Sequence, residues 1–197
     1  MIRVLLTALT IAASPVWATV DGWPALHDVV GVGSGDVLNV RADPNASAEI
    51  IGTLEYDATG VEVIRPDENF NWGMVNMGER PGWASLKFLA PQPGQWHGSY
   101  PEFAWCGGTE PFWSLTRAEG QIKLARIDDD DIVVPLQWEV GSTNHRERHA
   151  FRADGMTGVL SLQVCNDGMS EREFGIELNL ILDGEGTLYH GCCSLAP

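Results

Sequence analysis

The residue types that could carry out chemistry gather in the second half of the chain. All four cysteines lie there, at Cys106, Cys165, Cys192 and Cys193, and His190 stands just before the last two. A thiol hydrolase needs a thiol of lowered pKa, which a helix N-terminus or a close histidine commonly supplies. No helical pattern surrounds Cys106, and three other cysteines offer oxidation partners. We therefore expect structural disulfides and no catalytic thiol.

The pairing of these cysteines is only partly determined by the sequence. Four cysteines allow three pairings, and one of them joins the adjacent Cys192 and Cys193, which is possible only with strain. In the other two, Cys106 and Cys165 each bond one of the adjacent pair, whose side chains point to opposite faces of a strand. These two pairings stay open. The alternative is a zinc site of thiols with His190, but the chain lacks the C-x-x-C spacing of such sites.

Two motifs of the second half supply carboxylates. Glu110 and Trp113 belong to GTEPFW, and Asp167 and Arg172 belong to DGMSERE. Two carboxylates brought together would serve as general acid and base, as in a glycosidase. The alternative is that Glu110 and Asp167 bond the backbone of turns and pair with Arg172. We take these four residues as candidate binding residues and expect no catalytic residue.

Two further clusters have the residue types of metal ligands. In the run His145 to His149, two histidines and Glu147 would share one face of a strand, and Asp128 to Asp131 form a row of carboxylates. The first lacks the H-E-x-x-H order of zinc proteases, and the second lacks the Asp-x-Asp and glycine spacing of a calcium loop. We interpret them as a solvated strand and a hairpin turn, and expect neither metal nor cofactor.

Residues 1–18 have the pattern of a secretory signal peptide. Arg3 precedes an apolar run from Val4 to Ala13 that is short for a membrane span, and Val16 and Ala18 are small residues placed for cleavage after Ala18. The alternative is an uncleaved N-terminal anchor. The sequence predicts a periplasmic or secreted protein with no stable membrane anchor after cleavage.

The charge balance excludes nucleic acid as a main partner. The chain has 12 Lys and Arg against 27 Asp and Glu, a net charge of −15, and its only lysines are Lys87 and Lys123. A phosphate backbone requires clustered cations, and an anionic membrane surface is disfavoured for the same reason.

The elements that must position these residues fall into two segments, residues 19–90 and 102–197. The linker between them, residues 91–101, contains three prolines and two glycines. In the first segment, turn signals separate five expected short strands, at residues 37–41, 49–56, 61–65, 72–76 and 82–85. Five strands in so short a segment predict a small barrel.

The first segment resembles a known family through five motifs. LNVRADP (Leu38 to Pro44), IIGTL, VEVI, NWGMV and GWASLKFL (Gly82 to Leu89) follow in the order and spacing of bacterial Src-homology-3-like domains. This resemblance implies a small β-barrel that binds peptidoglycan, peptides or other components of the cell envelope.

A shallow groove on this barrel is the candidate ligand site. Aromatic side chains with polar neighbours offer a surface on which peptides or glycans stack. The candidate residues are Asn39, Arg41, Tyr56 and Trp72, with Phe70 and Phe88 as further aromatics. Trp83, which follows a glycine in a strand, is expected in the core.

The second segment alternates apolar and polar residues at period two, which predicts antiparallel strands in a barrel or sandwich with disulfides. Its clearest strand runs from Phe174 to Leu182, and Asp183-Gly184 then predicts a hairpin. The other expected inward-facing sets are Trp113 with Leu115, Ile122 with Leu124, Ile132 with Val134, Leu136 and Trp138, and Leu160 with Leu162 and Val164.

The second segment also resembles a family, one of uncharacterised bacterial envelope proteins and lipoproteins. The resemblance rests on CGGTEPFWSL, CNDGMSERE and HGCC. It implies an envelope location and brings no established activity. This chain lacks the lipidation cysteine of such lipoproteins, so the resemblance does not extend to membrane anchoring.

Together these patterns predict an exported, non-enzymatic binding protein. Its first domain binds peptidoglycan, or a peptide or protein of the envelope, and its second domain holds an unknown ligand or partner. The alternatives are a cell-wall hydrolase that the first domain targets, and a structural or stress-related envelope protein with protein partners only.

Overall fold

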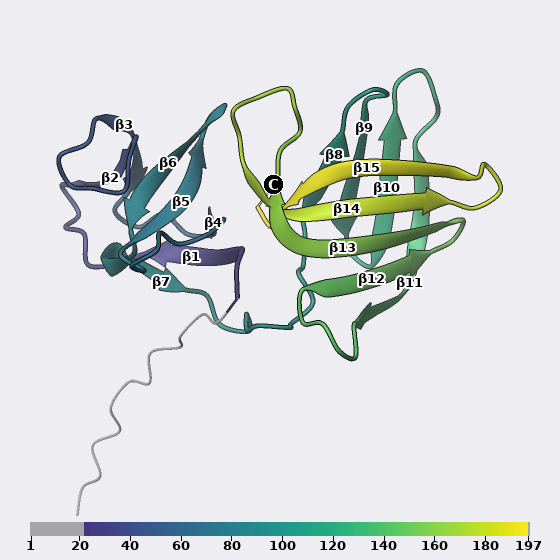
Figure 1. Ribbon diagram of the computed structural model, residues 1–197, viewed down its shortest axis with the longest axis horizontal. Coiled ribbons are helices and arrows are strands. Elements are labelled where there is room, and N and C mark those ends of the chain that lie inside the picture. The colour runs from purple at the N-terminus through teal and green to yellow at the C-terminus, as the bar shows by residue number, and fades with distance from the viewer. Residues whose placement is uncertain (1–21, 197) are drawn as a thin grey trace, which may run out of the picture.

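The computed structural model describes residues 22–196, and in that range the chain is all-β, as predicted (Figure 1). The one helical segment described is a 3-10 turn, Leu86–Phe88. Two β units lie side by side, the first in purple to teal and the second in teal to yellow. The predicted signal peptide, residues 1–18, lies outside the described residues. None of the helical structure in residues 22–196 is long and apolar enough to cross a membrane.

The first unit consists of two small sheets around one core. One sheet has the order β4 (Val61–Val63), β1 (Ala25–Val29), β7 (Leu89–Pro91), and the other has the order β3 (Ile50–Glu55), β2 (Val37–Arg41), β6 (Arg80–Ser85), β5 (Trp72–Met77). The sheets continue into each other where Ile64 N donates to Met74 O at 2.8 Å. The core is made of small apolar side chains, among them Val29, Leu38, Val40, Val63, Val75 and Leu89.

All five strands predicted in this segment are present, and β1 and β7 are additional. The prediction that Trp83 is a core residue was wrong. Its neighbours Gly82 and Ala84 face inward, and a Cβ on Gly82 would lie 2.6 Å from Val40, so the core has no room for a larger side chain there. Trp83 is half-buried on the other face, where the Arg65 guanidinium lies 5.1 Å from its ring centroid.

The second unit is a closed barrel of eight strands, which selects the barrel over the sandwich. Each strand pairs antiparallel with the next, and β15 closes the barrel on β8, so no edge is left open. The strands are β8 (Trp105–Gly108), β9 (Trp113–Ala118), β10 (Gln121–Arg126), β11 (Ile132–Gly141), β12 (Arg148–Ala153), β13 (Met156–Cys165), β14 (Phe174–Leu182) and β15 (Thr187–Ser194). The interior is filled by a core that includes the predicted inward face of β14.

Two β-bulges reverse the predicted orientation of some side chains of the barrel. The register of β11 against β12 shifts between Leu136 and Trp138, and that of β13 against β14 shifts between Leu162 and Cys165. A bulge adds one residue to a strand, so every later side chain changes face. Trp138 and Val164, both predicted to point inward, are therefore exposed.

Two disulfides hold the closing strands of the barrel. Cys106 bonds Cys193 and Cys165 bonds Cys192, which is one of the two pairings that the sequence left open. The first bond joins directly paired residues of β8 and β15, and the second ties the end of β13 to β15. Both indicate an oxidising environment outside the cytoplasm.

Specific contacts join the two units. Asn76 on β5 donates to the Glu173 carbonyl at 2.7 Å, and the Glu173 N–H donates back to Asn76 Oδ1 at 3.2 Å. The Ser194 hydroxyl donates to the carboxylate of Glu62 on β4. A Cβ on Gly175 would lie 2.7 Å from Pro24, so the start of β14 touches the first unit closely.

Candidate functional site

A hollow of about 490 Å³ opens on the first unit and gathers three of the four residues predicted there. We call it the Trp72 groove. Its polar and aromatic walls are Asp36, Asn39, Arg41, Trp72, Ser85 and Phe88, and a loop with Gly31 and Gly33 forms one rim. The volume falls in the range of small-ligand sites, about 300–1,000 Å³.

Two walls of the groove come from strand β2. Asn39 and Arg41 are alternate residues of that strand, so both side chains point to the same side. The register of β2 against β3 shifts between Val40 and Arg41, but the extra residue, Ile51, belongs to β3, so the alternation along β2 is unbroken. Arg41 Nη1 donates to the Ala48 carbonyl at 2.7 Å, which holds the guanidinium across the turn that follows.

A carboxylate at the preceding turn positions Trp72. Asp67 Oδ1 accepts the N–H groups of Asn71 and Trp72, both at 2.7 Å. Desolvation works against ionisation of this carboxylate, but the backbone donors, Trp72 first, outweigh it and hold the pKa of Asp67 below its ordinary value. The turn is therefore rigid and charged at neutral pH, and it fixes the start of β5 from which the indole projects.

Tyr56 does not join the groove, contrary to the prediction. It lies in the turn after β3 and does not line the hollow. The sequence pattern predicted a strand that includes Tyr56, but β3 ends one residue earlier, at Glu55. The glycine-rich loop of residues 31–36 is the part of the site that the sequence reasoning missed, although the repeated glycines in G-V-G-S-G were a visible loop signal.

The groove combines opposite charges with an aromatic wall. Asp36 and Arg41 supply one carboxylate and one guanidinium, and Trp72 and Phe88 supply aromatic surface. Asp36 Oδ1 accepts the Val37 N–H at 2.8 Å, and its second oxygen makes no hydrogen bond within residues 22–196. This set fits a zwitterionic or mixed-charge segment such as a short peptide, whose ammonium and carboxylate groups pair with the two charges.

A second hollow, of about 340 Å³, lies on the barrel where the sequence motifs meet. We call it the motif hollow. Glu110, Trp113, Asp167 and His190 all line it, together with Tyr189, so the two motif carboxylates do share one site. Arg172 does not line it. Its guanidinium lies 5.2 Å from the Phe174 ring centroid, so Arg172 does not join the other three candidate residues, and the alternative in which it pairs with Glu110 or Asp167 was wrong as well.

The glycines of these motifs have a structural reason. A Cβ on Gly108 would lie 2.4 Å from both the His190 carbonyl and Trp113 Nε1, and one on Gly191 would lie 2.2 Å from the Gly107 carbonyl. Glycine is required for β8 and β15 to close around the Trp113 indole, whose ring packs edge-on against Tyr189 with centroids 5.9 Å apart. Trp113 is therefore a buried wall of the hollow.

The polar groups of the motif hollow are largely engaged. Asp167 Oδ1 accepts the N–H groups of Met169 and Ser170 at 2.9 and 3.1 Å, as expected for a turn residue.

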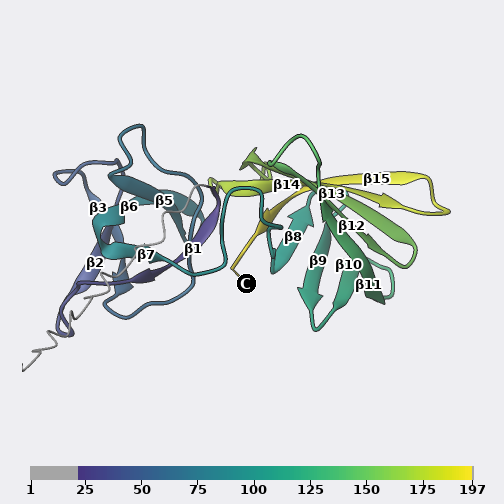
Figure 2. The same cartoon turned by 90° about the horizontal axis from the view of Figure 1, so that it is seen from below.

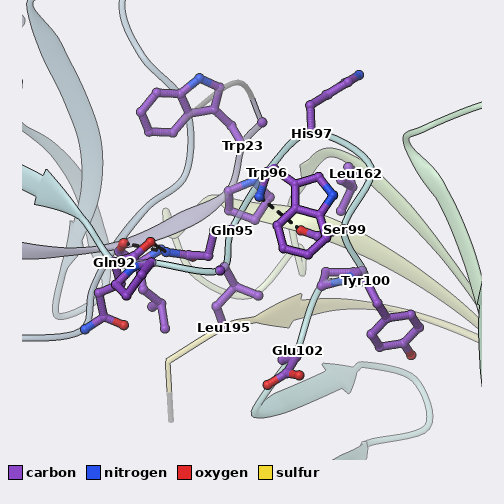
Figure 3. A pocket seen from close by; sticks show the side chains of 16 residues that line it. Trp23, Gln92, Gln95, Trp96, His97, Ser99, Tyr100, Glu102, Leu162 and Leu195 are labelled. Atoms are coloured by element: carbon purple, nitrogen blue, oxygen red, sulfur yellow. Dashed lines mark hydrogen bonds between the residues drawn. The ribbon is translucent and has the colours of Figure 1, made fainter. Parts of the chain in front are cut away.

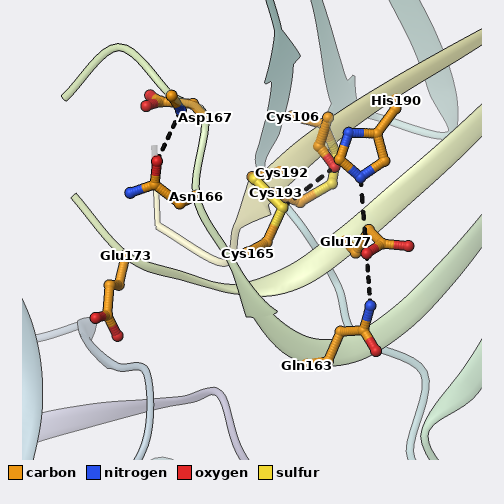
Figure 4. The surroundings of a disulfide bond; sticks show 12 residues. Cys106, Gln163, Cys165, Asn166, Asp167, Glu173, Glu177, His190, Cys192 and Cys193 are labelled. Atoms are coloured by element: carbon orange, nitrogen blue, oxygen red, sulfur yellow. Dashed lines mark hydrogen bonds and ion pairs between the residues drawn. A yellow bond between two sulfur atoms is a disulfide. The ribbon is translucent and has the colours of Figure 1, made fainter. Parts of the chain in front are cut away.

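Figure 4 shows His190 directed toward Glu177, with a Nε2 to Oε2 distance of 3.6 Å. Desolvation opposes ionisation of Glu177, but Gln163, Asn179 and His190 together keep its pKa below the ordinary value. Glu110 is exposed, and its side chain makes no hydrogen bond to any described residue.

Neither predicted metal-type cluster is preorganised for a metal ion. His145 and Glu147 lie in the turn before β12 and His149 is buried in that strand, where its Nε2 lies 3.0 Å from the Arg146 carbonyl, so the expected common face was wrong. Asp128 to Asp131 form the turn between β10 and β11, and two of them pair with cations, Asp129 with Arg126 and Asp131 with Lys123. Within residues 22–196 no group of three or more ligand-type side chains is placed to hold a metal ion.

Comparison with known proteins adds no relative: no protein-family model matches the chain, and no curated protein matches it. What the molecule itself defines is an all-β, disulfide-bonded, extracytoplasmic protein of two units, with an open groove on the first unit and a motif-lined hollow on the second.

Proposed function

We propose that this is an exported, non-enzymatic binding protein of the cell envelope, located in the periplasm or secreted, whose Trp72 groove binds a peptide segment of peptidoglycan or of an envelope protein. The observation that supports this most is the Trp72 groove itself. It brings Asn39, Arg41 and Trp72, which were singled out from the sequence, to one hollow next to Asp36 and Phe88.

In this proposal each residue that lines the groove makes a different contact with the peptide. Arg41 pairs with a peptide carboxylate, and the free oxygen of Asp36 pairs with an ammonium group. The indole of Trp72 packs against aliphatic parts of the peptide, and Asn39 bonds its backbone. In this proposal the barrel is the second module, rigid because of its disulfides, which holds a further ligand or partner.

Cosedimentation with purified peptidoglycan tests the proposal. The exported protein is compared with Trp72→Ala and with a matched control, Trp138→Ala, which removes an indole that is 46% exposed on the barrel surface. We expect the parent and the Trp138→Ala variant to sediment with the wall and at least a tenfold loss of bound protein for Trp72→Ala. Equal sedimentation of all three, or no sedimentation of the parent at moderate salt, would overturn wall binding through this groove.

A cell-wall hydrolase is the second candidate, because the motif hollow places Glu110, Asp167 and His190 around one open space. Zymography on cell-wall substrate decides it, with Glu110→Gln beside the parent. Clearing by the parent that Glu110→Gln abolishes would favour hydrolysis. No clearing by folded parent protein would remove this candidate.

A further inference from the structure

A third hollow, of about 540 Å³, lies between the two units (Figure 3). We call it the interunit hollow. It is walled by the segment that follows β7, residues 92–102, and neither the motifs nor the proposed function uses it. Its floor is apolar and comes from both units: Leu26 from β1, Leu162 from β13, and Leu195 from the end of the chain.

Two tryptophans stand at the hollow. Trp96 is 63% exposed, so one face of its indole is open to a ligand. Its segment is held in place, because the Trp96 N–H donates to Ser99 Oγ at 3.3 Å and the Ser99 N–H donates to the Trp96 carbonyl at 2.8 Å. Trp23 also lines the hollow, at its border with the first unit, where it stacks on His27 with ring centroids 5.5 Å apart and planes 3° apart.

The hollow is preformed. Gln95 Nε2 donates to the Leu26 carbonyl at 2.9 Å, and the Leu26 N–H donates to Gln95 Oε1 at 2.6 Å. The backbone N–H of Gln92 reaches the same carbonyl at 2.9 Å. These bonds fasten the segment to β1, so binding would require little ordering of the wall.

The chemistry of the lining selects a class of ligand. The indoles offer flat apolar faces, Glu102 offers an acceptor for hydroxyl groups at the rim, and the leucine floor suits a methyl group. Glu102 and the net charge of −15 disfavour an anion, and the lining has no second carboxylate to hold a strong cation. A sugar ring has an apolar C–H face and polar edges, and an acetamido group adds the methyl.

We propose that the interunit hollow binds a neutral, N-acetylated oligosaccharide, with Trp96 and Trp23 as stacking surfaces and the acetamido methyl on the leucine floor. This deepens the proposed function, because it assigns the glycan part of a cell-wall polymer to the interunit hollow and the peptide part to the Trp72 groove. Since the floor comes from both units, the ligand also stabilises their docking.

Isothermal titration calorimetry of the exported protein with tri-N-acetylchitotriose tests the inference. We expect Trp96→Ala to weaken binding at least tenfold and Trp23→Ala to weaken it severalfold. Trp138→Ala, the matched exposed indole on the barrel, and Trp72→Ala are expected to keep the parental affinity. Maltotriose, which has no acetamido groups, is expected to bind at least tenfold more weakly than the N-acetylated trisaccharide.

The outcomes separate this inference from the proposed function. No binding of the trisaccharide, equal binding of maltotriose, or unchanged affinity of Trp96→Ala would overturn it. Loss of the trisaccharide in Trp72→Ala would overturn it as well, because a single site would then explain all binding. Trisaccharide binding lost only in the Trp96 and Trp23 variants, in a protein that binds no wall peptide, would sustain this inference while the Trp72 groove proposal fails.

Discussion

The first unit and the barrel differ in what holds them together. The strands of the first unit are three to six residues long, and none of its described residues is a cysteine. The barrel has strands of up to ten residues, a closed hydrogen-bond ladder and two disulfides across its closing strands. The Trp72 groove lies on the less constrained unit, bordered by a glycine-rich loop. Binding loops are commonly carried at the low-stability end of a structure, and here the barrel is the rigid partner.

Removing the disulfides is expected to have the largest effect on stability, and it tests directly whether they hold the barrel together. In the chain-entropy description, the Cys106–Cys193 bond closes a span of 87 residues and the Cys165–Cys192 bond a span of 27. Replacing the first pair by serine is expected to lower the free energy of unfolding by about 4.5 kcal/mol, and the second pair by about 3.5 kcal/mol. Urea unfolding curves measure both losses.

The same variants test whether the first unit keeps its fold and its binding independently of the barrel disulfides. Peptide binding in the Trp72 groove is expected to survive the loss of either disulfide in conditions where the variant stays folded, because the bonds lie entirely in the barrel. Equal losses for the two pairs would contradict the entropic account, and loss of groove binding would contradict the separation of the two units.

A smaller effect is expected from the bonds between the units. Asn76→Ala removes the reciprocal pair with the Glu173 backbone and leaves both backbone groups without that partner. We expect a loss of about 1.5 kcal/mol in the free energy of unfolding, since each hydrogen bond contributes about 0.5–1.5 kcal/mol. Asn71→Ala is the control, because Asn71 is exposed on the same unit and its side chain makes no hydrogen bond to any described residue. An equal effect of the two substitutions would show that the contact between the units adds nothing.

The same comparison explains how far the sequence could predict the fold. The regular strand β14 was predicted to the residue, because its Phe174 to Leu182 alternation is unbroken and one face is fully buried. Trp138 and Val164 were misplaced, because a bulge depends on how two strands pair and leaves no mark on local periodicity. Strand β1 was missed because the polar residue His27 occupies an inward position that the pattern reserves for apolar side chains.

The sites follow the same rule. Asn39, Arg41 and Trp72 were predictable, since they lie on regular strands of one segment, whereas Tyr56 lies just beyond a strand end. The interunit hollow could not be predicted, because its floor combines Leu26 with Leu162 and exists only when the two units dock. The one local signal for it was Trp96, a large aromatic residue in a segment rich in proline and glycine.

The smallest expected effect concerns Glu62. This residue lies where the two units meet, so its protonation tests how they are held together. Burial raises the pKa of Glu62 above its ordinary value of 4.5, and the Ser194 hydroxyl, the N–H groups of Leu195 and Ala196, and the charge of Arg172 only partly offset this. The folded protein therefore holds this proton more tightly than the unfolded chain does. The resulting stability is fully present below pH 4.5 and is lost as the pH rises through the pKa of the folded state.

Glu62→Gln keeps an acceptor for Ser194 and removes the buried charge, so at pH 7 we expect it to be more stable than the parent by about 1 kcal/mol. At pH 4 the two are expected to unfold at the same urea concentration, and Glu55→Gln, at an exposed position of β3, is expected to show no such pH-dependent difference. A Glu62→Gln variant that is less stable than the parent at pH 7 would mean that the ionised carboxylate, bonded to the Ser194 hydroxyl, itself fastens the barrel to the first unit.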